Sequence, residues 1–196
     1  LAFVDLLGAV CLFVNAARGL SAVQLSRDLD VQHKTAFVLM HKLRETMTLE
    51  TRETRLEGEV EVDGAVFGGQ VRPANARDDR VDRRLLANRS GKRRVVVVLR
   101  QRGGRTLPRS FLREAQAVEF AREKIASGSV ISADEVAHWD VLEPDFEMKR
   151  VNHSEAYSRE GVHTNLAESY FSRLRRMIGG QHIRVEGRYL DAYAAH

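Results

Sequence analysis

Residues 59–63, Glu-Val-Glu-Val-Asp, begin the stretch that decides the fold. Their hydrophobic and acidic residues alternate strictly, with Val60 and Val62 facing one way and the three acids facing the other. This period of two predicts a strand with one buried face, which ends at Asp63. Residues 95–99, Val-Val-Val-Val-Leu, form a β-branched run that predicts a second, buried strand.

The elements expected after this pair follow one order along the chain. A hairpin turn at Gly103–Gly104 separates the second strand from a weaker third one. The predicted elements are a strand over 106–111, a helix over 114–126, strands over 130–133 and 147–151, and a helix over 165–178. Because this is the order of a ribonuclease-H-like fold, we expect residues 59–196 to form an α/β domain with a mixed sheet and flanking helices.

Residues 1–47 are predicted to form three helices in a small separate domain. Apolar residues recur at helical spacing up to about Arg18. A second helix is expected after Ser21, which has the sequence of an N-cap with a glutamine three residues on. A third helix is predicted from Gln32 to Thr46. Residues 48–58 are polar and mixed in charge, and they are expected to link the two domains.

The second and third predicted helices match a helix-turn-helix, whose second helix reads the major groove of DNA. The residues expected to contact DNA lie on the polar faces of that helix: Gln32, His33, Lys34, Thr35 and Lys42. A generic three-helix bundle has the same periodicity and is the alternative.

Positive charge is concentrated in one segment of the chain. The formal net charge is +4, yet residues 72–105 contain twelve Arg and Lys against three Asp, so this segment carries +9 and the rest −5. A focused basic segment indicates a polyanionic partner such as nucleic acid, with Lys92, Arg93 and Arg94 as expected contacts. A solvated basic loop without a partner is the alternative.

Cysteine content and hydropathy exclude several classes of protein. The one cysteine, Cys11, permits neither an internal disulfide nor a cysteine-based zinc cluster. Residues 1–17 are the most apolar stretch, but Asp5 and Asn15 interrupt them, and they are shorter than the ~20 residues that span a bilayer. No basic segment precedes them, so we expect a buried helix in a cytoplasmic protein rather than a signal peptide or membrane anchor.

Three acids stand where a ribonuclease-H-like fold brings strand ends and a helix together. Asp63 and Asp134 end predicted strands, and Glu168 lies in the first turn of the last long helix. Mg²⁺ prefers oxygen ligands, and two such ions roughly 3.5–4 Å apart stabilise the attacking and leaving oxygens of phosphodiester cleavage. The order of the acids therefore predicts a site for two such metal ions.

Each acid also has a purely structural explanation. Asp63 is suited to a turn beside Gly64, and Asp134 is suited to the N-cap of a helix over 135–142. Asn165 and Glu168 have the spacing of the N-cap and N3 residues of a capping box. Arg175 shares the helix face of Glu168, and Arg175 and Arg176 are expected to hold DNA phosphates, with a solvated cation as the alternative.

Five separated stretches resemble the ISXO2-like transposases of the IS1595 family of bacterial insertion sequences. They are VEVDGAVFGGQVRP at 60–73, SGKRRVVVVLRQRGGRTLP at 90–108, ISADEVAHWDVL at 131–142, FEMKRVNHSEAYS at 146–158 and HTNLAESYFSRLRRMIGG at 163–180. The resemblance covers most of residues 20–196. It implies a DDE-type recombinase that uses Mg²⁺ or Mn²⁺ to cleave insertion-sequence ends and transfer them into target DNA.

The resemblance also assigns residues. It implies that Asp63 and Asp134 are the first two catalytic acids and that Asn165, in the HTN motif, is the third. A basic residue that is normally lysine follows in the helix, and here it is Arg175. Because an amide oxygen is a poorer ligand than a carboxylate, Glu168 stays open as an alternative third residue. The implied partners are double-stranded DNA, as terminal repeats and target, and further copies of the chain on that DNA in the nucleoid, with no membrane.

Two features depart from the family pattern. Members commonly begin with a cysteine-rich zinc ribbon, which Cys11 alone cannot build, and the chain stops just inside its final predicted helix. Both ends are therefore expected to be truncated, and a catalytically inactive DNA-binding remnant or repressor is the alternative function.

Overall fold

The computed structural model describes residues 1–69, 74–82, 91–134, 137–151 and 164–196. Five strands form one sheet: β1 (Glu59–Gly68), β2 (Arg93–Gln101), β3 (Thr106–Phe111), β4 (Val130–Asp134) and β5 (Glu147–Val151). Their order is β3-β2-β1-β4-β5, with an antiparallel meander of β1, β2 and β3, and β4 and β5 parallel to β1. This mixed sheet with flanking helices is a ribonuclease-H-like fold, as predicted.

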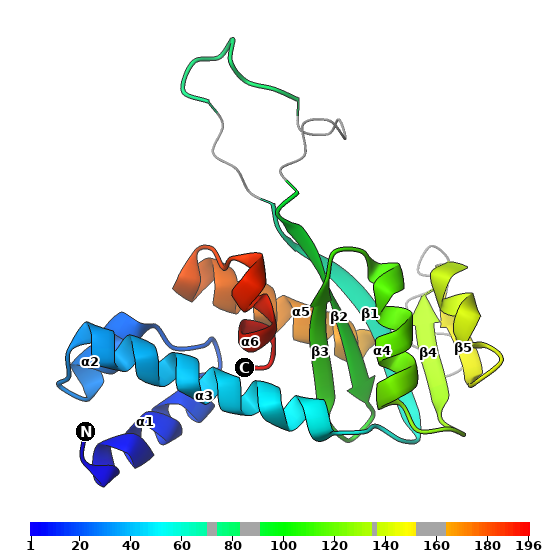
Figure 1. Cartoon of the computed structure of the whole chain (residues 1–196), viewed down its shortest axis with the longest axis horizontal. Helices are drawn as coiled ribbons and strands as arrows, with labels where there is room; N and C mark the ends of the chain where they lie inside the picture. The colour runs from blue at the N-terminus through cyan, green and yellow to red at the C-terminus, as the bar shows by residue number, and fades with distance from the viewer. Residues whose placement is uncertain (70–73, 83–90, 135–136, 152–163) are drawn as a thin grey trace.

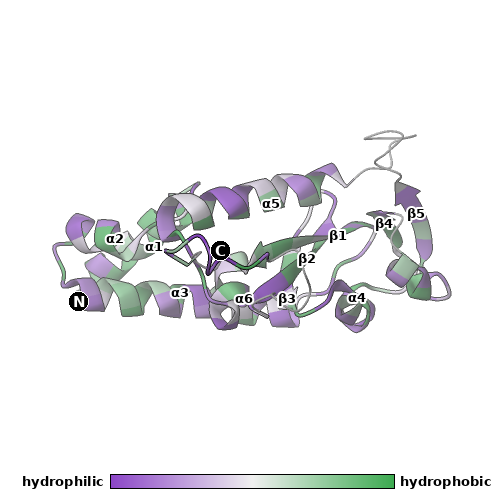
Figure 2. Ribbon diagram, turned by 90° about the horizontal axis from the view of Figure 1, so that it is seen from above, coloured by the Kyte–Doolittle hydropathy of each residue, from purple (hydrophilic) through white to green (hydrophobic). Residues whose placement is uncertain are grey.

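Helices cover both faces of the sheet. Figure 2 shows α5 (Asn165–Met177) along one side of β1 and β2 and α4 (Ala117–Lys124) along the other. The α4 side buries Val60 and Val62 of β1, and the α5 side buries Ala65 and Phe67. Both helices place their apolar faces on the sheet, which is the usual stable arrangement of a layered α/β domain.

The first strand differs from its prediction in length and in burial. β1 continues beyond Asp63 to Gly68, because its pairing with β2 extends from Val60 to Gly68 while its pairing with β4 ends at Val62. The prediction of one buried face is wrong as well. Glu61, expected on an outer face, is completely buried, because α5 covers that face of the sheet.

The N-terminal residues form the three predicted helices, α1 (Phe3–Asn15), α2 (Ala22–Asp28) and α3 (His33–Glu53). The Ser21 hydroxyl caps α2 by accepting a hydrogen bond of 3.1 Å from the Gln24 backbone N–H. α3 ends at Glu53 rather than near Thr46, so helix occupies half of residues 48–58. The division into a domain over 1–47, a linker over 48–58 and a catalytic domain over 59–196 stays a prediction.

The prediction that the first apolar stretch is a buried helix is wrong. Only Ala9 and Phe13 of α1 are buried, whereas Phe3, Val4 and Val14 are each at least 67% exposed. One stripe of α1 is covered because it packs into the small core formed with α2 and α3, and the remaining stripes face outward. Among the described residues, no helix has the length and hydrophobicity needed to cross a membrane.

The C-terminal residues join the sheet to the N-terminal helices. α5 is followed by a π-helical turn (Ile178–His182), a short 3₁₀ turn (Gly187–Tyr189) and α6 (Leu190–Ala194). Figure 1 shows α6 between the sheet and α3. The buried Arg44 of α3 stacks its guanidinium over the Tyr193 ring of α6 at 4.2 Å and lies 5.4 Å from the Phe13 ring of α1. Such cation–π contacts stabilise a desolvated arginine and here connect three helices.

Candidate active site

The two predicted aspartates come together where β4 ends against β1. In the parallel pairing of these strands, Val62 lies opposite Ala133, so Asp63 and Asp134 are the next residues in register. Neighbouring residues in register point to the same face of a sheet, and here that face is the one covered by α5. Asp63 therefore lies within β1, beside the carboxyl end of β4.

The charges of other acids act on Asp63. Its Oδ1 accepts a hydrogen bond of 2.7 Å from the Gly64 backbone N–H. Burial, followed by the charges of Asp134, Glu114 and Glu168, raises the pKa of Asp63 to about 7, although the Gly64 amide opposes this rise. Such crowding of carboxylates is unfavourable without a counter-charge, and it is the condition in which carboxylates bind a cation.

Asp134 is held through its backbone, and its side chain is left available. Arg150 donates a hydrogen bond of 2.9 Å from Nη1 to the Asp134 backbone carbonyl and pairs with Asp140 through Nη2. Among the described residues, the buried Oδ1 of Asp134 has no hydrogen-bond partner. The helix that Asp134 was predicted to cap would begin at residues 135–136, which lie outside the described part of the chain.

A fourth acid, Glu114, acts electrostatically on Asp63 from the α4 side of β1 and was not predicted from the sequence. It lies in the 3₁₀ turn (Glu114–Gln116) before α4, and its Oε1 is 3.6 Å from His138 Nε2. Burial, followed by the charge of Asp134, raises the pKa of Glu114. The glycine at position 64 could have indicated this contact, since a glycine inside a strand often marks a close approach by another group.

Gly64 leaves the space that the Glu114 carboxylate occupies. A Cβ atom built on Gly64 would lie 2.4 Å from Glu114 Oε1, closer than real Cβ contacts. We predict that Gly64→Ala lowers the melting temperature by displacing Glu114, and that Glu114→Ala in the same chain restores part of the loss. Thermal unfolding of both single variants and the double variant measures this coupling. Purely additive losses would contradict the contact.

The start of α5 is not the predicted capping box. Asn165 is the first residue of the helix rather than its N-cap, and the observed N-cap, Thr164, makes no side-chain capping hydrogen bond. The Glu61 carboxylate of β1 accepts hydrogen bonds from the first backbone amides of α5 instead. Asn165 and Glu168 are both exposed, and the charge of Glu168 contributes a small part to raising the pKa of Asp63.

The acid cluster is not a closed metal site. Within the residues that the structure describes, no three His, Cys, Asp or Glu side chains are arranged as a group that could hold a metal ion. Asp63 and Asp134 are nevertheless carboxylates in adjacent register, and Asp134 offers a buried oxygen without a hydrogen-bond partner among the described residues. Mg²⁺ commonly takes one or two carboxylates and completes its shell with water and substrate phosphates.

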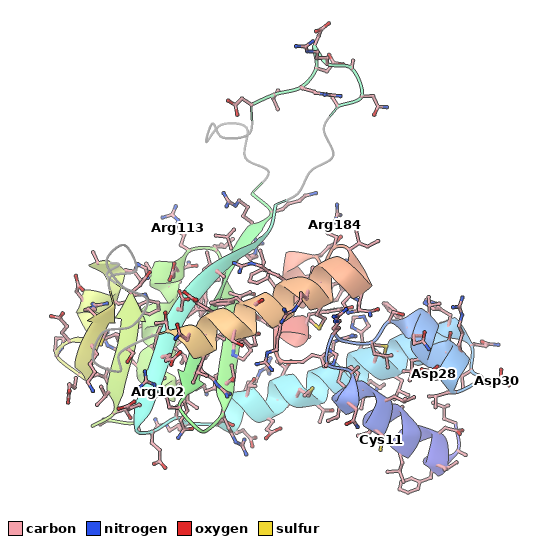
Figure 3. The ribbon with its side chains drawn as sticks, turned by 180° about the vertical axis from the view of Figure 1, so that it is seen from behind. Cys11, Asp28, Asp30, Arg102, Arg113 and Arg184 are labelled. Atoms are coloured by element: carbon pink, nitrogen blue, oxygen red, sulfur yellow. The ribbon has the colours of Figure 1, made fainter. Side chains whose placement is uncertain are left out.

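Basic residues line a cavity at the base of the β1–β2 hairpin. The hairpin projects from the sheet, with described residues 74–82 at its far end (Figure 1). A cavity of about 370 Å³ lies beside its base, and the charged residues that line it are Lys92, Arg94, Arg184, Glu186 and Arg188. Arg184 and Arg188, which come from the segment between α5 and α6, were not predicted from the sequence. Figure 3 shows Arg184 on the side from which the hairpin projects.

The remaining predicted DNA contacts fall in two places. On α5, Arg176 is exposed, and the Arg175 guanidinium lies 5.6 Å from the Phe67 ring and 6.0 Å from the Phe171 ring, over the edge of the core. At the start of α3, the side chains of Gln32, His33 and Lys34 are exposed and Thr35 is half-buried, while Lys42 is exposed about two turns beyond Thr35.

Comparison with known protein families identifies most of this chain. The family model described as the ISXO2-like transposase domain matches residues 55–196. The match contains the whole sheet, all four clustered acids and the basic cavity. No curated protein matches the sequence.

Proposed function

Because the chain belongs to the family of ISXO2-like transposases, we propose that it cleaves DNA at the ends of an insertion sequence and joins these ends to target DNA. The observation that carries the proposal is the adjacent register of Asp63 and Asp134 on β1 and β4 of a ribonuclease-H-like sheet, where the charges of Glu114 and Glu168 also act on Asp63. These acids are the right donors for hard divalent cations, which we expect to be Mg²⁺ or Mn²⁺.

The residues that would hold the ions are Asp63 and Asp134, with a third ligand from the first turn of α5. Bound divalent ions would acidify water and stabilise charge on the attacking and leaving oxygens of the phosphodiester. The chain's own task is to hold the carboxylates in fixed positions. β1 and β4 do this for the aspartates through their register, and Arg150 holds the end of β4.

DNA would reach these acids across the basic surfaces. We propose that Lys92, Arg94, Arg184 and Arg188 hold backbone phosphates beside the hairpin, and that Arg175 and Arg176 do so along α5. The exposed start of α3 remains the proposed major-groove reader. Since strand transfer joins two element ends to one target, we also propose that copies of the chain act together on DNA as a homo-oligomer.

The test uses a labelled duplex with the inverted repeat that flanks the gene encoding this chain. We expect Mg²⁺- or Mn²⁺-dependent nicking at the repeat end, followed by a joined product with a second duplex. Cleavage without joining would indicate a nuclease, and binding without cleavage would indicate a non-catalytic DNA-binding protein. Either outcome would overturn the proposal.

The third ligand can be decided by two substitutions. If Glu168 binds metal, Glu168→Gln should raise the Mg²⁺ concentration needed for half-maximal cleavage, because it removes a charge from the site. If Asn165 is the ligand, Asn165→Asp should keep or improve cleavage, because it supplies a carboxylate. Cleavage rates over a Mg²⁺ titration measure both effects.

The stability of the Glu168 variant and a matched control separate a metal ligand from a structural residue. Glu168 is exposed and is not the N3 residue of a capping box, and a role in metal binding alone predicts little change in melting temperature for Glu168→Gln. Glu143, an exposed acid outside the cluster, provides the matched control as Glu143→Gln. If Glu168→Gln retains full activity at limiting Mg²⁺, the third position belongs to Asn165.

A further inference from the structure

Glu61 is a buried acid that connects β1 to the start of α5. Its side chain is completely buried, and its Oε2 accepts hydrogen bonds of 2.9 Å from the Leu166 backbone N–H and 3.2 Å from the Ala167 backbone N–H. Its Oε1 lies 3.4 Å from Arg102 Nε. Figure 3 shows Arg102 at the end of the sheet where β1 begins.

These contacts explain why a carboxylate is buried at this position. An ionised carboxylate in a protein interior is strongly unfavourable unless charges or hydrogen bonds compensate it. The amino end of a helix supplies free amide donors and a partial positive charge. α5 has no side-chain cap from its own N-cap residue, Thr164, so Glu61 supplies from another element the acceptor that a local cap normally provides.

The position of Glu61 relates this tether to the acid cluster. Glu61 lies two residues before Asp63 and therefore on the same face of β1. The amides that it binds belong to the second and third residues of α5, between Asn165 and Glu168. β1 thus carries both Asp63 and Glu61. Glu61 fixes the first turn of α5, which bears Asn165 and Glu168, the two candidates for the third ligand.

We propose that Glu61 is the positioning residue of the site: by capping α5 from β1, it sets the distance between Asp63 and the third ligand on the first turn of the helix. This inference rests on the proposed function for the identity of the site. It assigns to Glu61 no contact with substrate. Removing such a supporting partner of a metal ligand typically lowers metal affinity by 10–100-fold.

The chain offers a matched control on the same strand. Glu59 pairs with the same Arg102 but is half-exposed, and the described contacts place no α5 amide beside it. We compare Glu61→Gln, Glu61→Ala and Glu59→Gln in the full chain, together with Asp63→Asn as a variant that lacks a proposed ligand. Glutamine keeps one carbonyl acceptor for the α5 amides, so it should act as the conservative, partly rescuing variant.

The first measurement is amide hydrogen exchange without metal or DNA. In Glu61→Ala, we expect exchange at Leu166 and Ala167 to rise at least about tenfold, since each loses a hydrogen bond, while Phe171 and Leu174 in the same helix stay protected. Glu61→Gln should give a smaller rise, and Glu59→Gln and Asp63→Asn should give none. Exchange that rises equally along all of α5 would indicate general destabilisation and would overturn the positioning role.

The second measurement is Mn²⁺ affinity by calorimetry, with cleavage followed in parallel. Glu61→Ala should weaken Mn²⁺ binding about tenfold or more, Glu61→Gln less, and Glu59→Gln not at all. Wild-type affinity in Glu61→Ala would overturn the inference. If the wild-type chain binds Mn²⁺ but cleaves nothing, the proposed function fails and the positioning role stands. If the wild-type chain binds no Mn²⁺, both fail, even if the exchange experiment confirms the cap.

Discussion

Asp63→Asn and Asp134→Asn should each reduce cleavage of the terminal repeat to background while leaving DNA affinity nearly unchanged. Each substitution keeps the shape of the side chain and removes the charge that would bind a divalent cation. The DNA contacts proposed above lie on other residues, at the hairpin base, along α5 and at the start of α3. A nicking assay with a parallel gel-shift titration measures the two properties separately, and Glu143→Gln is the control.

Asp63→Asn should also be more stable than the wild type above neutral pH when metal is absent. The pKa of Asp63 is about 7 in the folded chain against 3.8 ordinarily, so the folded state binds this proton more tightly than the unfolded state does. Stability of the wild type should therefore fall as pH rises from about 4 to about 7.

Asparagine does not ionise and avoids this loss. At about 1.4 kcal/mol for each unit of pKa shift, the gain at pH 8 is at most about 4 kcal/mol. Denaturant unfolding in EDTA at pH 4 and pH 8 measures it. Loss of folding or of DNA binding in both aspartate variants would show that the two residues support the structure rather than the chemistry.

Neutralising Lys92, Arg93 and Arg94 together should flatten the salt dependence of DNA binding. Each phosphate contact adds about −0.9 to the slope of log K against log salt concentration, so three lost contacts reduce the slope by up to about 2.7. The structure suggests a smaller share for Arg93, because Lys92 and Arg94 line the basic cavity with Arg184 and Arg188 and Arg93 does not. Binding titrations over a range of salt concentrations provide the slope.

Arg105 and Arg122 are suitable controls for this experiment. Each already forms an ion pair within the chain, Arg105 with Glu50 and Arg122 with Asp145, at 2.8 Å in both cases. Their joint replacement by glutamine should therefore leave the slope unchanged. If the triple variant at the hairpin also keeps the wild-type slope, the basic segment is a solvated surface without a role in DNA binding.

Local patterns predicted most of the secondary structure because each depends on neighbouring residues. The alternation over 59–63 and the valines at 95–99 identified β1 and β2, and Pro108 did not prevent β3 because β3 is an edge strand. Ser21 caps α2 through residues three positions apart. Where β1 and α3 ended was misjudged, since strand and helix ends depend on pairing and packing with distant segments.

Sequence by itself determined the family and the order of the strands and helices, and it predicted that Asp63 and Asp134 lie close together, because motifs and periodicity are properties of contiguous residues. Only the tertiary structure decided which other acids join them. Glu114 packs against β1 because Gly64 has no side chain, and Glu61 caps a helix 105 residues further along the chain. It also decided that most of α1 is exposed, since burial depends on which faces other elements cover. Contacts between residues so far apart leave no periodic signal in one sequence, because the chain must fold before they exist.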